Sequence, residues 1–255
     1  MDIPKGKKVY FASDQHFGVP NFDSSLVREK HFVKWLDMAK QDAEAIYLLG
    51  DLFDFWFEYS SVIPRGFTRV LGKIAEITDN GIPVYFFRGN HDMWTFDYLV
   101  KECGVVLITE PIDEVINGKT FLIGHGDGLG PGDKGYKFLK KFFAHPLMQW
   151  CFARLHPNLG VGIANYFSRR SRAANATADK VYHGDDKEWL VLYVKEELEK
   201  QHRDYFVFGH RHYPMDLDLG KNSHYINLGD WVVDFTYAVF DGDKMELKEF
   251  GSSNE

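Results

Sequence analysis

Cysteine is scarce in this chain, with only two among 255 residues. Cys103 and Cys151 stand in no CxxC pattern, which argues against a cysteine zinc site and against a disulfide framework. We expect both to be free, buried thiols in a reducing compartment. The fold must then depend on an apolar core, which a chain with 45% hydrophobic residues can build.

Long apolar runs are also missing. No stretch approaches the roughly 18 residues that a membrane-spanning helix needs. The first eight residues are polar and lead directly into a strand-like run, so we expect no signal peptide. These absences predict a cytoplasmic protein. The length predicts one large globular domain, or one domain with a sizeable insertion.

Acidic residues are absent from one continuous stretch, residues 134–178. It carries eight of the 30 Lys and Arg, so its charge is +8, while the remainder has 22 basic and 37 acidic residues and a charge of −15. Its aromatic residues are Tyr136, Phe138, Phe142, Phe143, Trp150, Phe152, Tyr166 and Phe167. A basic, aromatic-rich block suits an anionic amphiphile or a membrane surface. An ordinary helical cap, with its aromatic residues in the core, is the alternative.

Short β-rich runs alternate with helical patterns along the chain. Strands are predicted at 8–12, 45–49, 84–88, 105–108, 120–124 and 205–208, and helices at 24–41, 67–80, 96–103 and 185–201. The last 40 residues read as hairpin strands at 224–228, 235–240 and 245–250. The pattern predicts an α/β sandwich core that is interrupted by a helical insertion at about 131–182.

Polar clusters follow five of the predicted strands. In chain order they are DQH at 14–16, GDLFD at 50–54, GNHD at 89–92, GHGD at 124–127 and GHRH at 209–212. Ligands bind at the carboxyl ends of the strands in open α/β sheets, so we expect the five clusters to converge. One such cluster alone is more often a turn or a helix cap, whereas five in this order are specific.

The residue types in these clusters predict a metal centre. Carboxylate oxygens mixed with imidazole nitrogens and one Asn amide suit divalent Mn, Fe or Zn better than Mg or Ca. Asp14 and His16 stand two residues apart, so both can face one side of an extended strand end. The clusters offer more ligands than one ion needs, which indicates two ions bridged by one carboxylate.

The order DxH, GDxxD, GNHD, GHGD and GHxH resembles the calcineurin-like metallophosphoesterases over almost the whole chain. The resemblance implies an α/β fold with a β-sandwich flanked by helices, and two divalent ions, for which we expect Mn²⁺. It implies that one ion is held by Asp14, His16 and His212, the other by Asn90, His125 and His210, and that Asp51 bridges them.

His91 matches a catalytic histidine of that family that binds no metal. The resemblance implies that it faces the scissile phosphate and stabilises or protonates the leaving oxygen. A carboxylate beside it would raise its pKa, and Asp14 or Asp92 is the expected neighbour.

Within that superfamily the chain is most similar to the UDP-2,3-diacylglucosamine hydrolases of lipid A synthesis. The similarity rests on GDLFDFW at 50–56, HGDGLGPGDKGY at 125–136, SRRSRAANA at 168–176, GDW at 229–231 and the helical insertion. It implies that the insertion is a lid that encloses acyl chains and contacts the sugar and phosphate. The matching substrate-binding positions are Asp133, Tyr136, Arg169, Arg170, Ser171 and Asn175.

Two positions depart from the hydrolase pattern. The best-known members carry Arg where this chain has His91, although His is the general superfamily residue, so we expect the chemistry to be kept. The lysine that usually follows the SxxxN pattern has no match in register. Ala178 stands there, and Lys180 is the nearest lysine.

The resemblance implies hydrolysis of the pyrophosphate bond of UDP-2,3-diacylglucosamine to UMP and 2,3-diacylglucosamine 1-phosphate, at the cytoplasmic face of the inner membrane. Another calcineurin-like phosphodiesterase or phosphatase is the first alternative, acting on a nucleotide, a phosphoprotein or another phospholipid-like substrate. The charge of −15 outside residues 134–178 disfavours nucleic acid as a partner. Two further alternatives fit less well. A non-catalytic scaffold that has lost its metals would also lack the metal ligands, and a lipid-binding carrier would not need them.

Overall fold

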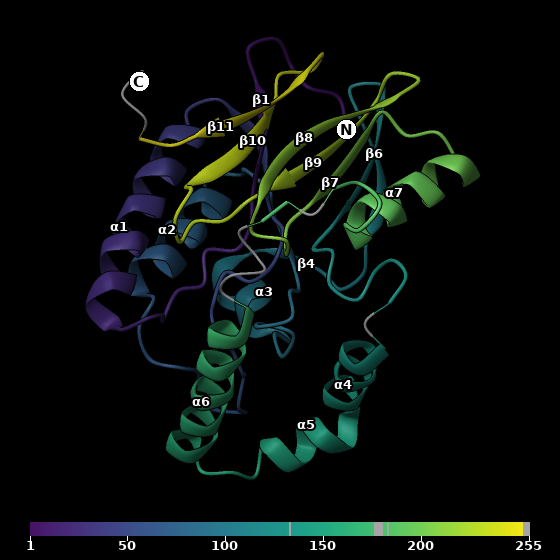
Figure 1. Cartoon of the computed structure of the whole chain (residues 1–255). Coiled ribbons are helices and arrows are strands. Elements are labelled where there is room, and N and C mark those ends of the chain that lie inside the picture. The colour runs from purple at the N-terminus through teal and green to yellow at the C-terminus, as the bar shows by residue number, and fades with distance from the viewer. Residues whose placement is uncertain (133, 176–180, 183, 252–255) are drawn as a thin grey trace.

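Two β-sheets form the centre of the computed structural model, which describes residues 1–132, 134–175, 181–182 and 184–251 (Figure 1). The first has the order β11-β10-β1-β2-β3-β4 and the second β5-β6-β7-β9-β8. The strands are β1 (Lys8–Ala12), β2 (Ala43–Leu48), β3 (Val84–Phe87), β4 (Val106–Ile108), β5 (Ile112–Ile116), β6 (Lys119–Gly124), β7 (Tyr205–Phe208), β8 (Pro214–Gly220), β9 (Ser223–Leu228), β10 (Thr236–Phe240) and β11 (Met245–Glu249). Strands β1 to β4 are parallel, as are β6, β7 and β9.

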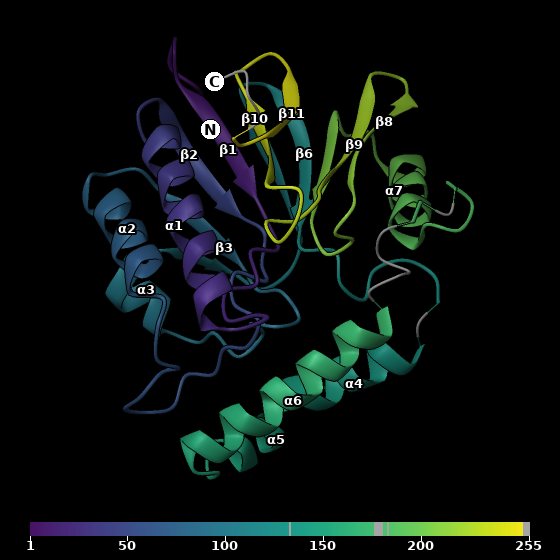
Figure 2. The same cartoon turned by 60° about the vertical axis from the view of Figure 1, so that its left-hand side comes forward.

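Helices cover the outer faces of both sheets (Figure 2). The first sheet is covered by α1 (Phe22–Ala39), α2 (Thr68–Asp79) and α3 (Tyr98–Cys103), and the second by α7 (Trp189–Lys200). Because strand side chains alternate between faces, Tyr10 and Ala12 pack toward α1, whereas Val9 and Phe11 pack toward the second sheet. The predicted α/β class, a β-sandwich flanked by helices, is confirmed.

Three further helices lie apart from this sandwich, beyond the carboxyl ends of its parallel strands (Figures 1 and 2). They are α4 (Lys134–Ala144), α5 (Pro146–Phe152) and α6 (Pro157–Asn175), and together we call them the helical arm. In α6 the side chains of Arg169 and residues 171–175 are outside the description. The arm falls within the insertion predicted at 131–182.

The sequence pattern missed two edge strands. In β5, Asp113 and Val115 are exposed, and in β8, Asp216 and Asp218 alternate with half-buried leucines. Charges on an edge strand discourage pairing with another chain. In β8 the alternation of Met215, Leu217 and Leu219 with charged residues is a period-2 strand signal that the sequence analysis missed. Helix α7 begins at Trp189, four residues later than predicted.

The two thiols are free, but only one is buried. Cys103 lies in the core, whereas Cys151 is exposed on α5, so the expectation of two buried thiols was wrong for Cys151. None of the described helices is long and apolar enough to cross a bilayer.

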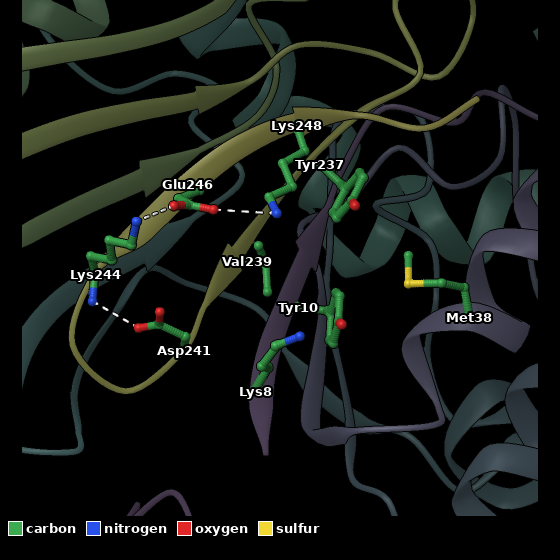
Figure 3. A pocket seen from close by; sticks show the side chains of 9 residues that line it. All are labelled: Lys8, Tyr10, Met38, Tyr237, Val239, Asp241, Lys244, Glu246 and Lys248. Carbon is green, nitrogen blue, oxygen red and sulfur yellow. Dashed lines mark hydrogen bonds and ion pairs between the residues drawn. The ribbon is translucent and has the colours of Figure 1, made fainter. Parts of the chain in front are cut away.

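A pocket of about 150 Å³ lies between the first sheet and the end of α1 (Figure 3). Its lining consists of Lys8, Tyr10, Met38, Tyr237, Val239, Asp241, Lys244, Glu246 and Lys248. Glu246 lies between two of these lysines and forms an ion pair with each. No residue of the five polar clusters lines this pocket, so it is separate from the candidate site.

Candidate active site

The five polar clusters meet where the carboxyl ends of the two sheets come together. Hydrogen bonds join loops from different strands: the Asp14 amide donates to the Gly50 carbonyl (3.1 Å), and the His210 amide donates to Asp14 Oδ2 (2.9 Å). The His91 amide donates to Asp51 Oδ1 (2.8 Å). The predicted convergence is therefore present in the structure.

Several residues of these loops have a left-handed backbone conformation, which sets the direction of their side chains. Ten non-glycine residues in the described part of the chain have positive φ, and five of them belong to the clusters. They are Asp14, His16, Asp51, His210 and His212, with φ between 46° and 65°. Such residues cost of order 1–3 kcal/mol each and collect at functional sites. The fold tolerates this strain at five of the seven residues predicted to bind metal.

Glycine allows the loops to approach this closely. A Cβ on Gly209 would lie 2.5 Å from Asp14 Oδ2, and a Cβ on Gly89 would overlap the Asp51 carboxylate. Both glycines are the first residue of a cluster, so the GNHD and GHRH motifs need glycine for close backbone approach.

One group of donor atoms consists of Asp14, His16, Asp51 and His212. His212 Nε2 lies 3.0 Å from Asp14 Oδ1 and 3.1 Å from His16 Nε2. His16 Nε2 is 3.6 Å from Asp14 Oδ1. Three predicted ligands thus direct their donor atoms at one point.

A second group consists of Asp51, His125 and His210. His125 Nε2 lies 3.1 Å from Asn90 Oδ1 and 3.4 Å from Asp51 Oδ2. The same Asp51 oxygen lies 3.7 Å from His16 Nε2 of the first group. Asp51 therefore stands between the two groups, as a bridging carboxylate would.

This donor set fits divalent metal ions. Two imidazole Nε2 atoms face each other at 3.1 Å, an arrangement that a shared cation explains. Asp14 Oδ1 is buried, and His212 Nε2 and His16 Nε2 lie 3.0 and 3.6 Å from it, so one carboxylate oxygen and two imidazole nitrogens share a small space. Clustered Asp and His side chains of this kind bind divalent metal.

A backbone carbonyl holds the His125 ring, and carboxylates lie near the outer nitrogens of His16 and His212. His125 Nδ1 lies 2.6 Å from the Leu49 carbonyl oxygen. A carbonyl only accepts, so the proton stays on Nδ1 and Nε2 faces the cluster. Asp54 Oδ1 is 3.6 Å from His16 Nδ1, and Asp230 Oδ2 is 3.8 Å from His212 Nδ1.

The charges in the cluster are strongly coupled. Burial raises the pKa of Asp51, but the neighbouring His125 and His91 more than offset it and hold that pKa well below its usual range. Burial lowers the pKa of His125, and Asp51 outweighs this and raises it to about 10. Burial and the repulsion from His125 lower the pKa of His210 to about 4. An ion that binds here must therefore displace a proton from His125.

His91 lies beside these groups with 19% of its side chain exposed. Its Nδ1 is 2.8 Å from the Asp54 carbonyl oxygen and 3.6 Å from Asp54 Oδ1. The neighbouring carboxylate is thus Asp54 and not Asp14 or Asp92. Asp92 instead accepts hydrogen bonds from the Leu52 and Gly89 amides, at 2.8 and 2.7 Å, and so joins the GDLFD and GNHD loops.

The predicted substrate-binding residues are only partly visible. Tyr136 donates to Asp127 Oδ2 (2.7 Å), with its ring 6.3 Å from that of His210. Arg170 is exposed on α6. Asp133, Ala178 and Lys180 lie outside the described residues, as do the side chains of Arg169, Ser171 and Asn175. The substrate-binding roles remain predictions.

Two carboxylates to which the sequence analysis gave no role join the arm to the centre. Asp127 forms an ion pair with Lys140 Nζ (2.8 Å), and Asp54 Oδ2 accepts a hydrogen bond from Ser168 Oγ (2.8 Å). Asp127 is the last residue of the GHGD cluster, and Asp54 is the last residue of GDLFD. Their place in these clusters was the one sequence signal that could have indicated a role for them. Ser168 stands 114 positions from Asp54, too far along the chain for a local pattern to reveal.

The arm exposes a large apolar surface. Exposed side chains on its helices are Phe138, Leu139, Phe142, Phe143, Leu147, Trp150, Leu159, Ile163, Tyr166 and Phe167. Phe152 instead packs on Trp94 and Phe57, with ring centroids at 4.6 and 4.7 Å. A helical cap with its aromatic residues in the core was the alternative, and this arrangement does not fit it.

A buried ion pair supports the loop that carries His210 and His212. Arg211 contacts both oxygens of Glu188, at 2.8 and 2.9 Å, and donates to the Val181 carbonyl oxygen at 2.6 Å. Glu188→Ala removes the carboxylate that faces a buried guanidinium, so we expect unfolding to become easier by about 3–5 kcal/mol. Thermal or urea unfolding measures this.

The matched control is the exposed pair of Asp185 and Lys195, at 2.8 Å. Asp185→Ala should cost only about 0–1 kcal/mol. Equal small losses in both variants would show that the Glu188 pair adds no stability to this loop.

Comparison with known proteins identifies the family of this chain. Residues 7–214 match the family model described as calcineurin-like phosphoesterase. A UDP-2,3-diacylglucosamine hydrolase of Porphyromonas gingivalis is 38% identical over 94% of this chain and 97% of that protein. One of Edwardsiella ictaluri is 30% identical over 78% and 77%, respectively. Among solved structures, the Escherichia coli phosphoesterase Yfce is 15% identical, with a TM-score of 0.48, and the match covers 96% of this chain and 93% of Yfce. Because the family model spans most of its length, the chain belongs to the calcineurin-like phosphoesterase family.

Proposed function

We propose that the chain hydrolyses the pyrophosphate bond of UDP-2,3-diacylglucosamine, and so forms UMP and 2,3-diacylglucosamine 1-phosphate. The observation that carries the proposal is a metal-binding cluster placed next to an exposed apolar arm. A phosphoesterase centre accounts for the bond, and the apolar surface accounts for the acyl chains. The names of the curated relatives support the same substrate.

Two Mn²⁺ ions are the proposed cofactors. Asp14, His16 and His212 would hold one, Asn90, His125 and His210 the other, and Asp51 would bridge them. Support comes from the two donor groups that share Asp51. When bound, such ions lower the pKa of a coordinated water and neutralise charge on the phosphoryl oxygens.

His91 acts on the leaving oxygen in this proposal. Its Nδ1 faces the Asp54 carbonyl, which keeps a proton on that nitrogen. Nε2 is then the atom left to meet the substrate, and as an imidazolium it would donate a proton or a hydrogen bond to the departing oxygen.

The arm is the proposed lid over this centre. Its aromatic surface would bind the acyl chains, while Tyr136, Arg169, Arg170, Ser171, Asn175 and Asp133 would contact the sugar and phosphates. Support comes from contacts of the arm with the centre through Asp127 and Asp54. The single domain would then comprise all 255 residues, with the lid at about 131–182.

The same surface supports a peripheral location at the cytoplasmic face of the inner membrane. Arg154 lies 4.7 Å over the exposed Trp150 ring, so positive charge and aromatic surface occur side by side. Basic residues attract anionic lipid headgroups, and aromatic side chains insert at the interface.

Substrate preference tests the proposed function. The whole protein with Mn²⁺ is assayed on UDP-2,3-diacylglucosamine, on UDP-N-acetylglucosamine and on bis-p-nitrophenyl phosphate. We expect the highest kcat/KM for the diacyl compound. A similar or higher kcat/KM for the acyl-free compounds would point to another phosphodiesterase of the family.

Removal of aromatic surface from the arm should weaken only the lipid reaction. Trp150 and Phe142 are 56% and 42% exposed, so Trp150→Ala and Phe142→Ala should leave the melting temperature unchanged. Each side chain could contribute up to about 1.5–3 kcal/mol of contact with an acyl chain. We therefore expect kcat/KM for the diacyl substrate to fall roughly 10- to 100-fold, with little change for bis-p-nitrophenyl phosphate.

Phe22→Ala is the matched control, since Phe22 is 70% exposed on α1, outside the arm. It should change neither reaction. Equal losses on lipid and small substrates in the arm variants would mean that the arm is only a packing element.

A further inference from the structure

One side chain of the arm reaches into the centre. Ser168 on α6 donates its hydroxyl proton to Asp54 Oδ2 at 2.8 Å, because a carboxylate only accepts. Asp54 is 2% exposed. A hydrogen bond to a buried carboxylate is among the stronger ones in proteins.

The other oxygen of the same carboxylate faces two histidines. Asp54 Oδ1 lies 3.6 Å from His16 Nδ1 and 3.6 Å from His91 Nδ1. The two imidazole rings are nearly perpendicular, with centroids 4.9 Å apart. Asp54 Oδ1 is therefore within ion-pair distance of a predicted metal ligand and of the predicted catalytic histidine, and the Asp54 carbonyl oxygen also lies 2.8 Å from His91 Nδ1. Asp54 thus contacts the arm through Oδ2 and His91 through its carbonyl oxygen.

The terminal torsion of an aspartate is soft and has no sharp staggered minima. A hydrogen bond that holds Oδ2 therefore helps to fix where Oδ1 points. Among the side chains of α6 that the structure describes, Ser168 is the one with a hydrogen bond to this centre. Its bond forms only when α6 lies over the strand ends.

We propose that Ser168 is a positioning residue which links the seating of the arm to the orientation of His91 through Asp54. The inference rests on the proposed function and deepens it. The centre is fully ordered only with the arm in place, and a substrate whose acyl chains hold the arm down is turned over fastest. Small phosphoesters, which do not contact the arm, depend on its spontaneous closure.

The test uses the whole metal-loaded protein, four single variants and the double variant that combines Ser168→Ala with Asp54→Asn. Ser168→Ala removes the hydroxyl, Ser168→Thr keeps it, and Asp54→Asn removes the acceptor charge. The fourth, Asn158→Ala, changes an exposed side chain in the first turn of α6 and serves as the arm control. For each variant kcat and KM are measured on UDP-2,3-diacylglucosamine and on bis-p-nitrophenyl phosphate. Metal content and the rate of tryptic cleavage within the arm are measured as well.

We expect Ser168→Ala to lower kcat about tenfold on both substrates, which corresponds to one lost hydrogen bond to a charged group. KM should change little, metal content should stay the same, and the arm should be cleaved faster. Ser168→Thr and Asn158→Ala should behave like the parent protein.

A double-mutant cycle separates positioning from a merely structural role. If Ser168 acts through Asp54, Ser168→Ala should have almost no further effect on kcat in the Asp54→Asn background. Fully multiplicative effects would overturn the inference. So would a change confined to KM for the diacyl substrate, or a loss of metal in Ser168→Ala.

Failure of the proposed function is distinguishable from failure of this inference. If the parent protein cleaves bis-p-nitrophenyl phosphate but not the diacyl substrate, the substrate assignment fails. The cycle on the small phosphodiester still decides whether Ser168 positions the centre.

Discussion

Asp51→Ala is expected to abolish phosphoester hydrolysis and to remove bound metal in the same step. Asp51 Oδ2 faces His16 of one donor group and His125 of the other, at 3.7 and 3.4 Å. A ligand shared by both ions cannot be removed without weakening both. Metal analysis of the purified variant, together with an assay on bis-p-nitrophenyl phosphate, measures the two effects.

Folding must be controlled in that experiment, since Asp51 is buried and Oδ1 accepts the His91 amide. Asp51→Asn keeps the shape and an acceptor oxygen but removes the charge, and it should also lose metal. Asp37→Ala changes a surface carboxylate that pairs with Lys40 and Lys73, and should keep both metal and activity. Two ions per chain in Asp51→Ala would refute the bridging role.

His91→Ala should lower kcat by roughly 10²–10⁴, the usual contribution of a positioned acid or base. Metal content should not change, because the proposed ligand set does not include His91. Metal analysis of the variant checks this expectation. The check matters because His91 also lies with His16 and Asp54 in a group that could hold an ion. Loss of an ion in His91→Ala would make His91 a ligand.

Two matched variants sharpen this result. His91→Arg introduces the residue of the best-known hydrolases and should retain more activity than His91→Ala, because a cation still faces the leaving oxygen. His224→Ala removes a surface imidazole that lies 3.3 Å from Asp216 and should have no effect. If His91→Arg is as inactive as His91→Ala, a cation alone is insufficient at this position.

The parts of the fold that the sequence predicts well are those with local apolar patterns. Strands β1 and β7 have the predicted bounds, and the other parallel strands differ by one or two residues. The clusters could be located because a parallel sheet puts the ends of its strands at one edge. Their convergence needs no long-range information beyond the strand order.

The support behind the ligands could not be predicted in this way. Asp54 meets Ser168 across 114 positions of the chain, and Asp230 faces His212 from the loop after β9. Neither contact leaves a local pattern. The sequence also could not predict that the aromatic residues on the arm are exposed. An amphipathic helix has the same sequence pattern whether its apolar face contacts a core, a lipid or water.

Metal-dependent release of UMP tests the central claim most directly. Protein freed of metal by a chelator is mixed with UDP-2,3-diacylglucosamine, and UMP and the lipid product are quantified before and after Mn²⁺ is added. The proposed function predicts no turnover without metal, and equal amounts of UMP and 2,3-diacylglucosamine 1-phosphate after its addition. Hydrolysis of bis-p-nitrophenyl phosphate by the same Mn²⁺-loaded protein without any release of UMP would contradict it.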